Sequence, residues 1–241
     1  MAKNIQTEIE KLKNQIVYLG TAVQENMQKS VKALWEKNPD LARQVIATDK
    51  GEIDSLEISV EEECLRLLAL HQPVAGDLRF IVTVLKIDND LERIGDLAAK
   101  IADKVILLHD VDPVRFAADD MRIPEMFNSM FAKTIWMFQN TMEAFINEDT
   151  DLAYKVCLED DEVDRDKASI RTEMEEIILH DPAQQVYLAK LISVARSMER
   201  IADHCTNICE DIIYMAQGKI VRHHIAELSS LPAQTKLIPE G

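Results

Sequence analysis

The feature that most constrains the fold of this chain is an internal repeat. Three short segments recur with matching residue types in the two halves: 40–42 with 151–153, 70–73 with 179–182, and 92–96 with 199–203. The separation within these pairs falls from 111 to 109 to 107 residues, as small insertions or deletions in the connections would produce. Self-similarity of this kind predicts two copies of one structural unit.

Prolines mark the ends of the segments within each copy. Pro39, Pro73, Pro113 and Pro182 stand between long stretches that contain almost no helix breaker. Gly and Pro contribute only 6 and 7 of the 241 residues, too few for a turn-rich β fold. The stretches predict six helices, over residues 4–37, 40–71, 74–109, 117–147, 151–180 and 183–217. Helices of this length usually pack lengthwise in bundles.

The third predicted helix of each copy carries an apolar seam with alternating spacings of four and three residues. In the first copy the seam comprises Phe80, Val84, Ile87, Leu91, Ile94, Ala98, Ile101, Val105 and Leu108. The positions 107 residues later are also all apolar: Tyr187, Leu191, Val194, Met198, Ile201, Cys205, Ile208, Ile212 and Met215. Such seams favour lengthwise packing between helices. The expected fold is therefore all-α, with tandem three-helix bundles related by a pseudo-twofold over residues 1–112 and 113–220, and a tail over 221–241.

The charge balance excludes several classes of function. There are 43 acidic residues against 27 Lys and Arg, a formal net charge of −16. Such a surface repels nucleic-acid backbones and disfavours anionic lipid, but it allows docking onto a basic protein. No apolar run approaches the ~18 residues that span a bilayer, and no apolar leader opens the chain, so we expect neither membrane insertion nor secretion.

The chain also lacks the motifs of several enzyme classes. We find no GxxxxGK[ST], GxGxxG, GxSxG or HExxH segment, and we therefore expect no enzyme activity. The four cysteines show no CxxC spacing and lie at apolar packing positions, which predicts small core residues with reduced thiols in a cytoplasmic protein. His71 and His180 precede proline turns, where they are expected to cap helix ends.

The repeated Glu-x-x-x-Asp segment is the candidate functional site. Glu92 and Asp96 lie one helical turn apart beside the apolar seam, as do Glu199 and Asp203 in the second copy. Like charges in this arrangement destabilise a helix, and a bound multivalent cation would reverse that effect. Carboxylate oxygens suit Mg, Mn, Ca and iron. A simpler interpretation, a solvated acidic face, stays open from the spacing alone.

Two longer runs of residues resemble the PhoU family. They are residues 67–79 followed by 90–96, and residues 195–204 continuing to 207–210. The resemblance implies a cytoplasmic negative regulator of phosphate uptake and of phosphate-starvation signalling. It also implies that the protein bridges the ATPase subunit of a phosphate ABC transporter and a sensor histidine kinase. We further expect a homodimer.

The same resemblance implies metal ions, with iron, zinc, manganese and magnesium as candidates, on the repeated acidic motifs. Glu92, Asp96, Glu199 and Asp203 match those motifs directly. A further acidic pair is expected early in the middle helix, and Asp160 and Asp164 fit it in the second copy. In the first copy Asp54 fits, whereas one extra residue between positions 49 and 54 is expected to put Asp49 out of phase. The second copy is therefore expected to hold the more complete site.

Two other functions compete with this interpretation. A ferritin-like di-iron enzyme would need paired Glu-x-x-His motifs, and none of the six histidines has Glu three residues before it. A metal-free helical adaptor without any phosphate-specific role remains the alternative. Direct phosphate binding is disfavoured because the sequence contains neither a P-loop nor an obvious basic cluster.

Overall fold

The computed structural model describes residues 2–111, 116 and 123–218, and all regular structure in these ranges is helical. The elements are α1 (Ala2–Trp35), α2 (Pro39–Thr48), the π-helical η1 (Asp49–Ile53), α3 (Asp54–His71), α4 (Ala75–Val111), α6 (Met126–Asn147), α7 (Thr150–His180), the 3₁₀ turn η2 (Pro182–Gln184) and α8 (Gln185–Gln217). The predicted all-α fold is confirmed. The predicted domain boundary at 112/113 and the tail over 221–241 lie outside the described residues.

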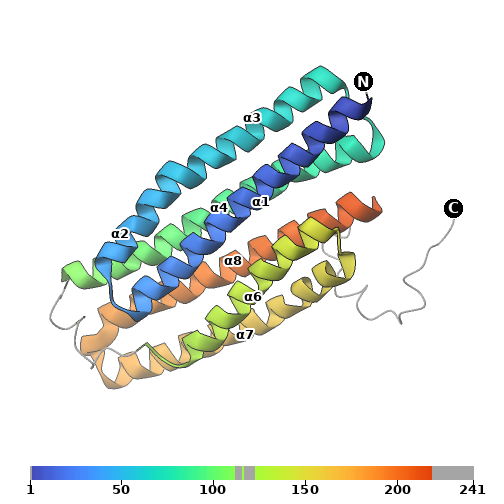
Figure 1. Ribbon diagram of the computed structural model, residues 1–241. Helices are drawn as coiled ribbons and strands as arrows, with labels where there is room; N and C mark the ends of the chain where they lie inside the picture. The colour runs from blue at the N-terminus through green and yellow to red at the C-terminus, as the bar shows by residue number, and fades with distance from the viewer. Residues whose placement is uncertain (1, 112–115, 117–122, 219–241) are drawn as a thin grey trace, which may run out of the picture.

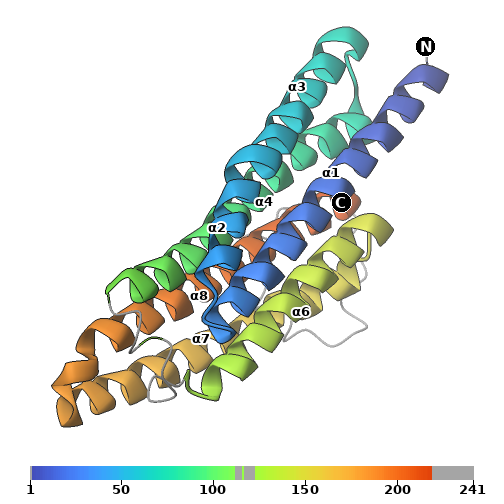
Figure 2. The ribbon, with the colours of Figure 1, turned by 60° about the vertical axis from the view of Figure 1, so that its left-hand side comes forward.

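The helices form two bundles that lie side by side along their length (Figure 1). One bundle contains α1, the continuous rod of α2, η1 and α3, and α4, and the other contains α6, α7 and α8 (Figure 2). The bundles meet through α1 and α4 on one side and α6 and α8 on the other. Among the described residues, the middle rod of each bundle, α2–α3 or α7, therefore packs within its own repeat.

The apolar seams predicted from the sequence form the centre of the structure. All nine seam residues of α4 and all nine of α8 are buried, and α4 packs against α8. Polar contacts between the repeats accompany this core: the Lys86 ammonium lies 2.9 Å from Asp211 Oδ1, and His204 Nδ1 lies 2.7 Å from Asp90 Oδ1. The seam residues thus pack the two repeats against each other and also contribute to the core of each bundle.

Equivalent caps begin the middle rods of the two repeats. The Asn38 side chain accepts hydrogen bonds from the backbone N–H groups of Asp40 and Leu41, and Pro39 occupies the first helical turn. Asp149, 111 positions later, accepts from the backbone N–H of Leu152. Asn and Asp satisfy backbone donors that a helix N-terminus leaves without partners. The duplication therefore extends to the local signals that begin a helix.

Two helix predictions need correction. Of the helix predicted over 117–147, residues 117–122 lie outside the described residues, residues 123–125 are not helical, and α6 begins at Met126. Pro124 explains the late start, because proline lacks a backbone N–H and disfavours helical geometry in the residue before it. The single α-helix predicted over 40–71 is continuous but contains the π turn at Asp49–Ile53.

The predicted roles of the cysteines and of one histidine are consistent with the structure. All four cysteines are free; Cys64, Cys205 and Cys209 are buried and Cys157 is half-buried. The His180 ring lies 2.8 Å from the backbone oxygen of Glu176 at the end of α7, in keeping with a capping role. No helix within the described ranges combines the length and apolarity needed to cross a bilayer.

The duplicated core gives the first testable prediction. Ile94→Ala on α4 and Ile201→Ala on α8 remove equivalent buried side chains, so each should lower the free energy of unfolding by about 2–5 kcal/mol. Urea unfolding measures both, and Ile146→Ala on α6, where the side chain is 43% exposed, is the control with an effect below about 1 kcal/mol. A large difference between Ile94→Ala and Ile201→Ala would contradict the equivalence of the two seams.

Candidate metal centre

A π turn absorbs the extra residue that was expected to put Asp49 out of phase in the first repeat. In this turn the backbone N–H of Asp54 donates to the backbone oxygen of Asp49, five residues earlier. A π turn contains one residue more than an α turn, so the extra residue is absorbed within it. Asp49 and Asp54 therefore lie one turn apart and line the same pocket, and the prediction that Asp49 is out of phase was wrong.

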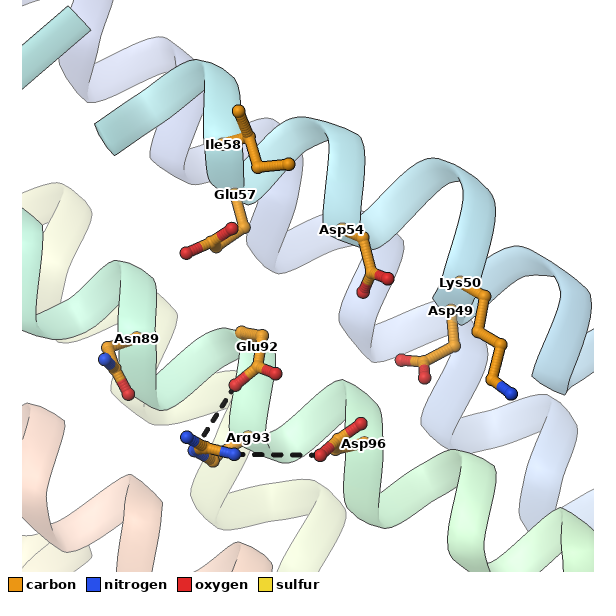
Figure 3. Close-up of a pocket in the computed structure, with 9 residues that line it drawn as sticks. All are labelled: Asp49, Lys50, Asp54, Glu57, Ile58, Asn89, Glu92, Arg93 and Asp96. Carbon is orange, nitrogen blue, oxygen red and sulfur yellow. Dashed lines mark ion pairs between the residues drawn. The ribbon is translucent and has the colours of Figure 1, made fainter. Parts of the chain in front are cut away.

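This first pocket lies between the middle rod and α4 and has a volume of about 400 Å³ (Figure 3). It is lined by Asp49, Lys50, Asp54, Glu57, Ile58, Asn89, Glu92, Arg93 and Asp96. The side chains of Glu57 and Asp54 extend from α3 toward α4, where Glu92 and Asp96 lie on successive turns (Figure 3). The structure thus brings the three acids predicted for the first repeat together and adds Asp49 and Glu57.

Gly95 allows the π turn to approach α4 closely. A Cβ atom at position 95 would lie 2.8 Å from Asp49 Oδ1 and 3.2 Å from Ile53 Cγ2, too close for either contact to remain unchanged. The glycine therefore provides the space in which the Asp49 carboxylate lies, 3% exposed. The second repeat has Ala202 at the equivalent position on α8, and its middle rod, α7, contains no π turn.

The first pocket has an excess of negative charge. Burial, with repulsion from Asp96, Asp54 and Glu92, raises the pKa of Asp49 to about 7. Burial also raises the pKa of Glu57 and of Glu92. Two nearby cations pair along α4 itself: Arg93 lies 3.4 Å from Glu92 and 3.8 Å from Asp96, and Lys100 lies 3.6 Å from Asp96. These pairs leave the acids of the middle rod facing those of α4.

Asp88 is an acid beside this pocket that the sequence analysis missed. It precedes Glu92 by one turn, is only 2% exposed, and its Oδ1 atom has no hydrogen-bond partner. Burial, with repulsion from Glu57, Glu61 and Glu92, raises the pKa of Asp88 to about 8. A buried carboxylate oxygen without a donor is costly, and a proton or a cation relieves that cost. The available signal was the continuation of the four-residue acidic spacing from Asp96 through Glu92.

The second repeat places its predicted acids at equivalent positions. Asp160 lies 111 positions after Asp49, and Asp164 lies 110 positions after Asp54. Burial, with repulsion from Asp203, Asp164 and Glu199 among its neighbours, raises the pKa of Asp160 to about 7. Burial and the charges of Glu199 and Asp164 likewise raise the pKa of Asp203. All four acids predicted for the second repeat are thus close enough to interact.

A lysine is already present among the acids of the second repeat. Lys167 Nζ on α7 lies 2.8 Å from Asp164 Oδ1 and 2.7 Å from Glu199 Oε1 on α8. The ammonium therefore joins the middle rod to the third helix. In neither repeat do the described side chains include three His, Cys, Asp or Glu groups that already converge on one ion. Coordination of a metal would need rotation of carboxylates about their side-chain torsions.

The fold and its acidic sites define a class: duplicated three-helix bundles with carboxylate-lined pockets between the second and third helices. Comparison with known proteins is more specific, because the model of the PhoU domain matches twice, over residues 16–105 and 127–212. The chain belongs to the PhoU family.

Relatives and solved structures agree over most of the chain. A phosphate-specific transport system accessory protein PhoU homolog of Aquifex aeolicus is 39% identical over 91% of this chain and 96% of that protein. The PhoU protein of Escherichia coli is 31% identical over 90% of this chain and 86% of its own. A crystal structure of PhoU from Pseudomonas aeruginosa superposes with a TM-score of 0.80 at 33% identity, covering 89% of this chain and 99% of that one.

The raised acid pKa values predict how stability depends on pH. In the metal-free folded protein Asp49, Asp88 and Asp160 keep their protons up to pH about 7–8, whereas the unfolded chain loses them near pH 4. The stabilisation is complete below pH 4 and is lost as pH rises through the folded pKa values. The melting temperature of metal-free protein should therefore fall between pH 5 and pH 8.

Asp49→Asn tests the contribution of a single acid. This variant should stabilise metal-free protein at pH 8, by on the order of 1 kcal/mol, and should flatten the pH profile. Glu62→Gln, at an exposed position on α3, should leave the profile unchanged. An identical pH profile for Asp49→Asn and wild type would contradict the assignment.

Proposed function

We propose that this protein is a negative regulator of phosphate uptake and of phosphate-starvation signalling, and that it acts in the cytoplasm by binding rather than by catalysis. The observation that carries the proposal is the PhoU domain match over both repeats, together with relatives of nearly equal extent. The Thermotoga maritima relative, named as a phosphate-specific transport system accessory protein PhoU homolog, is 32% identical over 94% of this chain and 95% of its own.

In this role the protein bridges the ATPase subunit of a phosphate ABC transporter and a sensor histidine kinase. A bridge needs two separate surfaces, and the repeat supplies equivalent ones at opposite ends of the elongated molecule (Figures 1 and 2). Leu70, at the α3–α4 turn, is 67% exposed, and Leu179, at the α7–α8 turn, is 79% exposed. Val74 and Leu78 are also exposed shortly after Leu70 in the chain, and Val186 shortly after Leu179. Each end therefore carries more than one exposed apolar side chain, which supports contacts with two proteins. We further propose that the active form is a homodimer.

A deletion strain tests the regulatory proposal. Without the protein, phosphate-starvation genes should stay switched on in phosphate-rich medium, because the transporter no longer reports to the kinase. A reporter fused to a starvation-induced promoter measures this, and the wild-type gene supplied on a plasmid should restore repression. Normal repression in the deletion strain would exclude the role.

Copurification separates the bridging role from regulation in general. Tagged protein from membranes should retain both the transporter ATPase subunit and the kinase in high phosphate. The amounts of the two partners that copurify should change together in low phosphate. Retention of neither would favour the alternative, a helical adaptor with no phosphate-specific role.

We propose that the first pocket binds metal ions, with iron, zinc, manganese and magnesium as candidates. The residues fit such an ion: Asp49, Asp54 and Glu57 face Glu92 and Asp96 across the pocket, and all offer the oxygen ligands that hard cations prefer. The orphan Oδ1 atom of Asp88 supports the proposal, because it is buried beside acids without a donor. A bound cation would neutralise the repulsion that raises the acid pKa values and would join the middle rod to α4.

Metal analysis with thermal melts tests this proposal. Glu92→Gln combined with Asp96→Asn should abolish the metal content of protein purified without chelator and leave helicity intact. Wild type should gain roughly 5–10 °C in melting temperature when Mn²⁺ is 100-fold above its Kd, and the double variant should gain nothing. The charge-matched control is Glu25→Gln with Glu36→Gln, which changes one exposed acid on α1 and one exposed acid directly after its end. Wild type that carries no metal and melts identically with chelator would overturn it.

A further inference from the structure

The charged groups that line the corresponding pockets of the two repeats differ. Asp49, Asp54, Glu57, Glu92 and Asp96 line the first pocket against only two cations, Lys50 and Arg93. The second pocket, between α7 and α8, is lined by Lys167, Arg171, Arg196, Arg200, Glu199 and Asp203. Asp160 and Asp164, the equivalents of Asp49 and Asp54, interact with Glu199 and Asp203 but do not line this pocket. The duplicated motif alone does not show this difference, because Glu92 and Asp96 recur without change as Glu199 and Asp203.

The charge is reversed at two neighbouring positions of the repeat, of which one lies next to the acidic motif. Glu57 follows Asp54 by three residues, and Lys167 follows Asp164 by three residues, so the two are equivalent with a separation of 110 residues. The first repeat therefore has a carboxylate at the place where the second has an ammonium. Glu61 and Arg171, one turn further along, repeat the same reversal of charge.

Lys167 occupies the place that a metal would need. Its ammonium lies 2.8 Å from Asp164 and 2.7 Å from Glu199, which are the equivalents of Asp54 and Glu92. Although burial opposes it, hydrogen bonding to Asp164 and Glu199 raises the pKa of Lys167, so the group stays charged. A metal ion entering here would have to displace a tethered cation and would then meet three arginines.

We propose that Lys167 is the built-in counter-ion of the second pocket, so that this protein takes up metal in its first repeat and excludes it from the second. The inference rests on the proposed metal binding of the first pocket for its first half, whereas the exclusion is a property of Lys167. It reverses the expectation from the sequence that the second copy holds the more complete site. The ammonium bridge supplies the link between α7 and α8 that a metal would supply between the middle rod and α4 in the first repeat.

The decisive variant is Lys167→Glu, which gives the second pocket the residue that the first pocket has. Without metal, this variant should melt below wild type, because three acids then face one another across α7 and α8. Titration with Mn²⁺ should show additional bound manganese and should raise the melting temperature by roughly 5–10 °C more than in wild type at 100-fold excess over Kd. Arg171→Glu, with the same change of charge on the same helix, should gain no manganese.

The acids of each pocket show where the manganese binds. In otherwise wild-type protein, Glu199→Gln with Asp203→Asn should leave manganese content unchanged, whereas in the Lys167→Glu background the same pair should remove the gain. Glu57→Lys is the reverse exchange, and it should abolish manganese binding at the first pocket while the far-ultraviolet circular dichroism stays as in wild type.

The outcomes separate this inference from the proposed metal function. If Lys167→Glu gains no manganese, or if Glu199→Gln with Asp203→Asn lowers the content of the wild type, Lys167 does not exclude metal and the inference fails. If wild type binds no manganese but Lys167→Glu does, metal binding at the first pocket fails while the role of Lys167 stands.

Discussion

Lengthwise burial of the seams on α4 and α8 is the interaction on which the rest of the structure depends. Only a helix with apolar residues at spacings of three and four can bury a continuous stripe against a neighbour of similar length. Because both seams are buried and the helices run in opposite directions, their pairing relates the repeats by a pseudo-twofold (Figure 1). The remaining faces of α4 and α8 are then available to the middle rods, and the acidic positions fall at that second contact.

The contacts between the middle rod and the third helix differ in charge between the two repeats. The chain has a large acidic excess, yet its carboxylates are not spread evenly over a solvated surface. Several of them converge between two helices, where burial makes each additional negative charge more expensive. In the second repeat the Lys167 ammonium offsets this repulsion. The first repeat keeps an excess of carboxylates, and the Oδ1 atom of Asp88 has no hydrogen-bond partner. Identical motifs on α4 and α8 therefore stand in different electrostatic surroundings.

Most of the fold could be predicted from the sequence because it depends on periodic signals. The seams, the repeated caps and the proline boundaries are local and regular, and only Pro124 was overlooked as a helix boundary. The site was harder to predict, because it depends on the phase of one helix relative to another. Asp49 could not be placed without knowing that the extra residue is absorbed in a π turn. The contact of Lys167 with Glu199 could not be predicted without knowing how α7 packs against α8.

The π turn at Asp49–Ile53 confines the effect of one inserted residue to a short stretch of the middle rod. The helix on each side keeps its own pitch, and the mismatch of one residue ends within the five residues of the turn. The same insertion inside regular α-helix would rotate every later residue by about 100° and carry Val60, Cys64 and Leu67 out of the core. After a duplication, such a defect lets one copy change its length at the site without losing its packing, so the two halves can diverge in chemistry while remaining alike in shape.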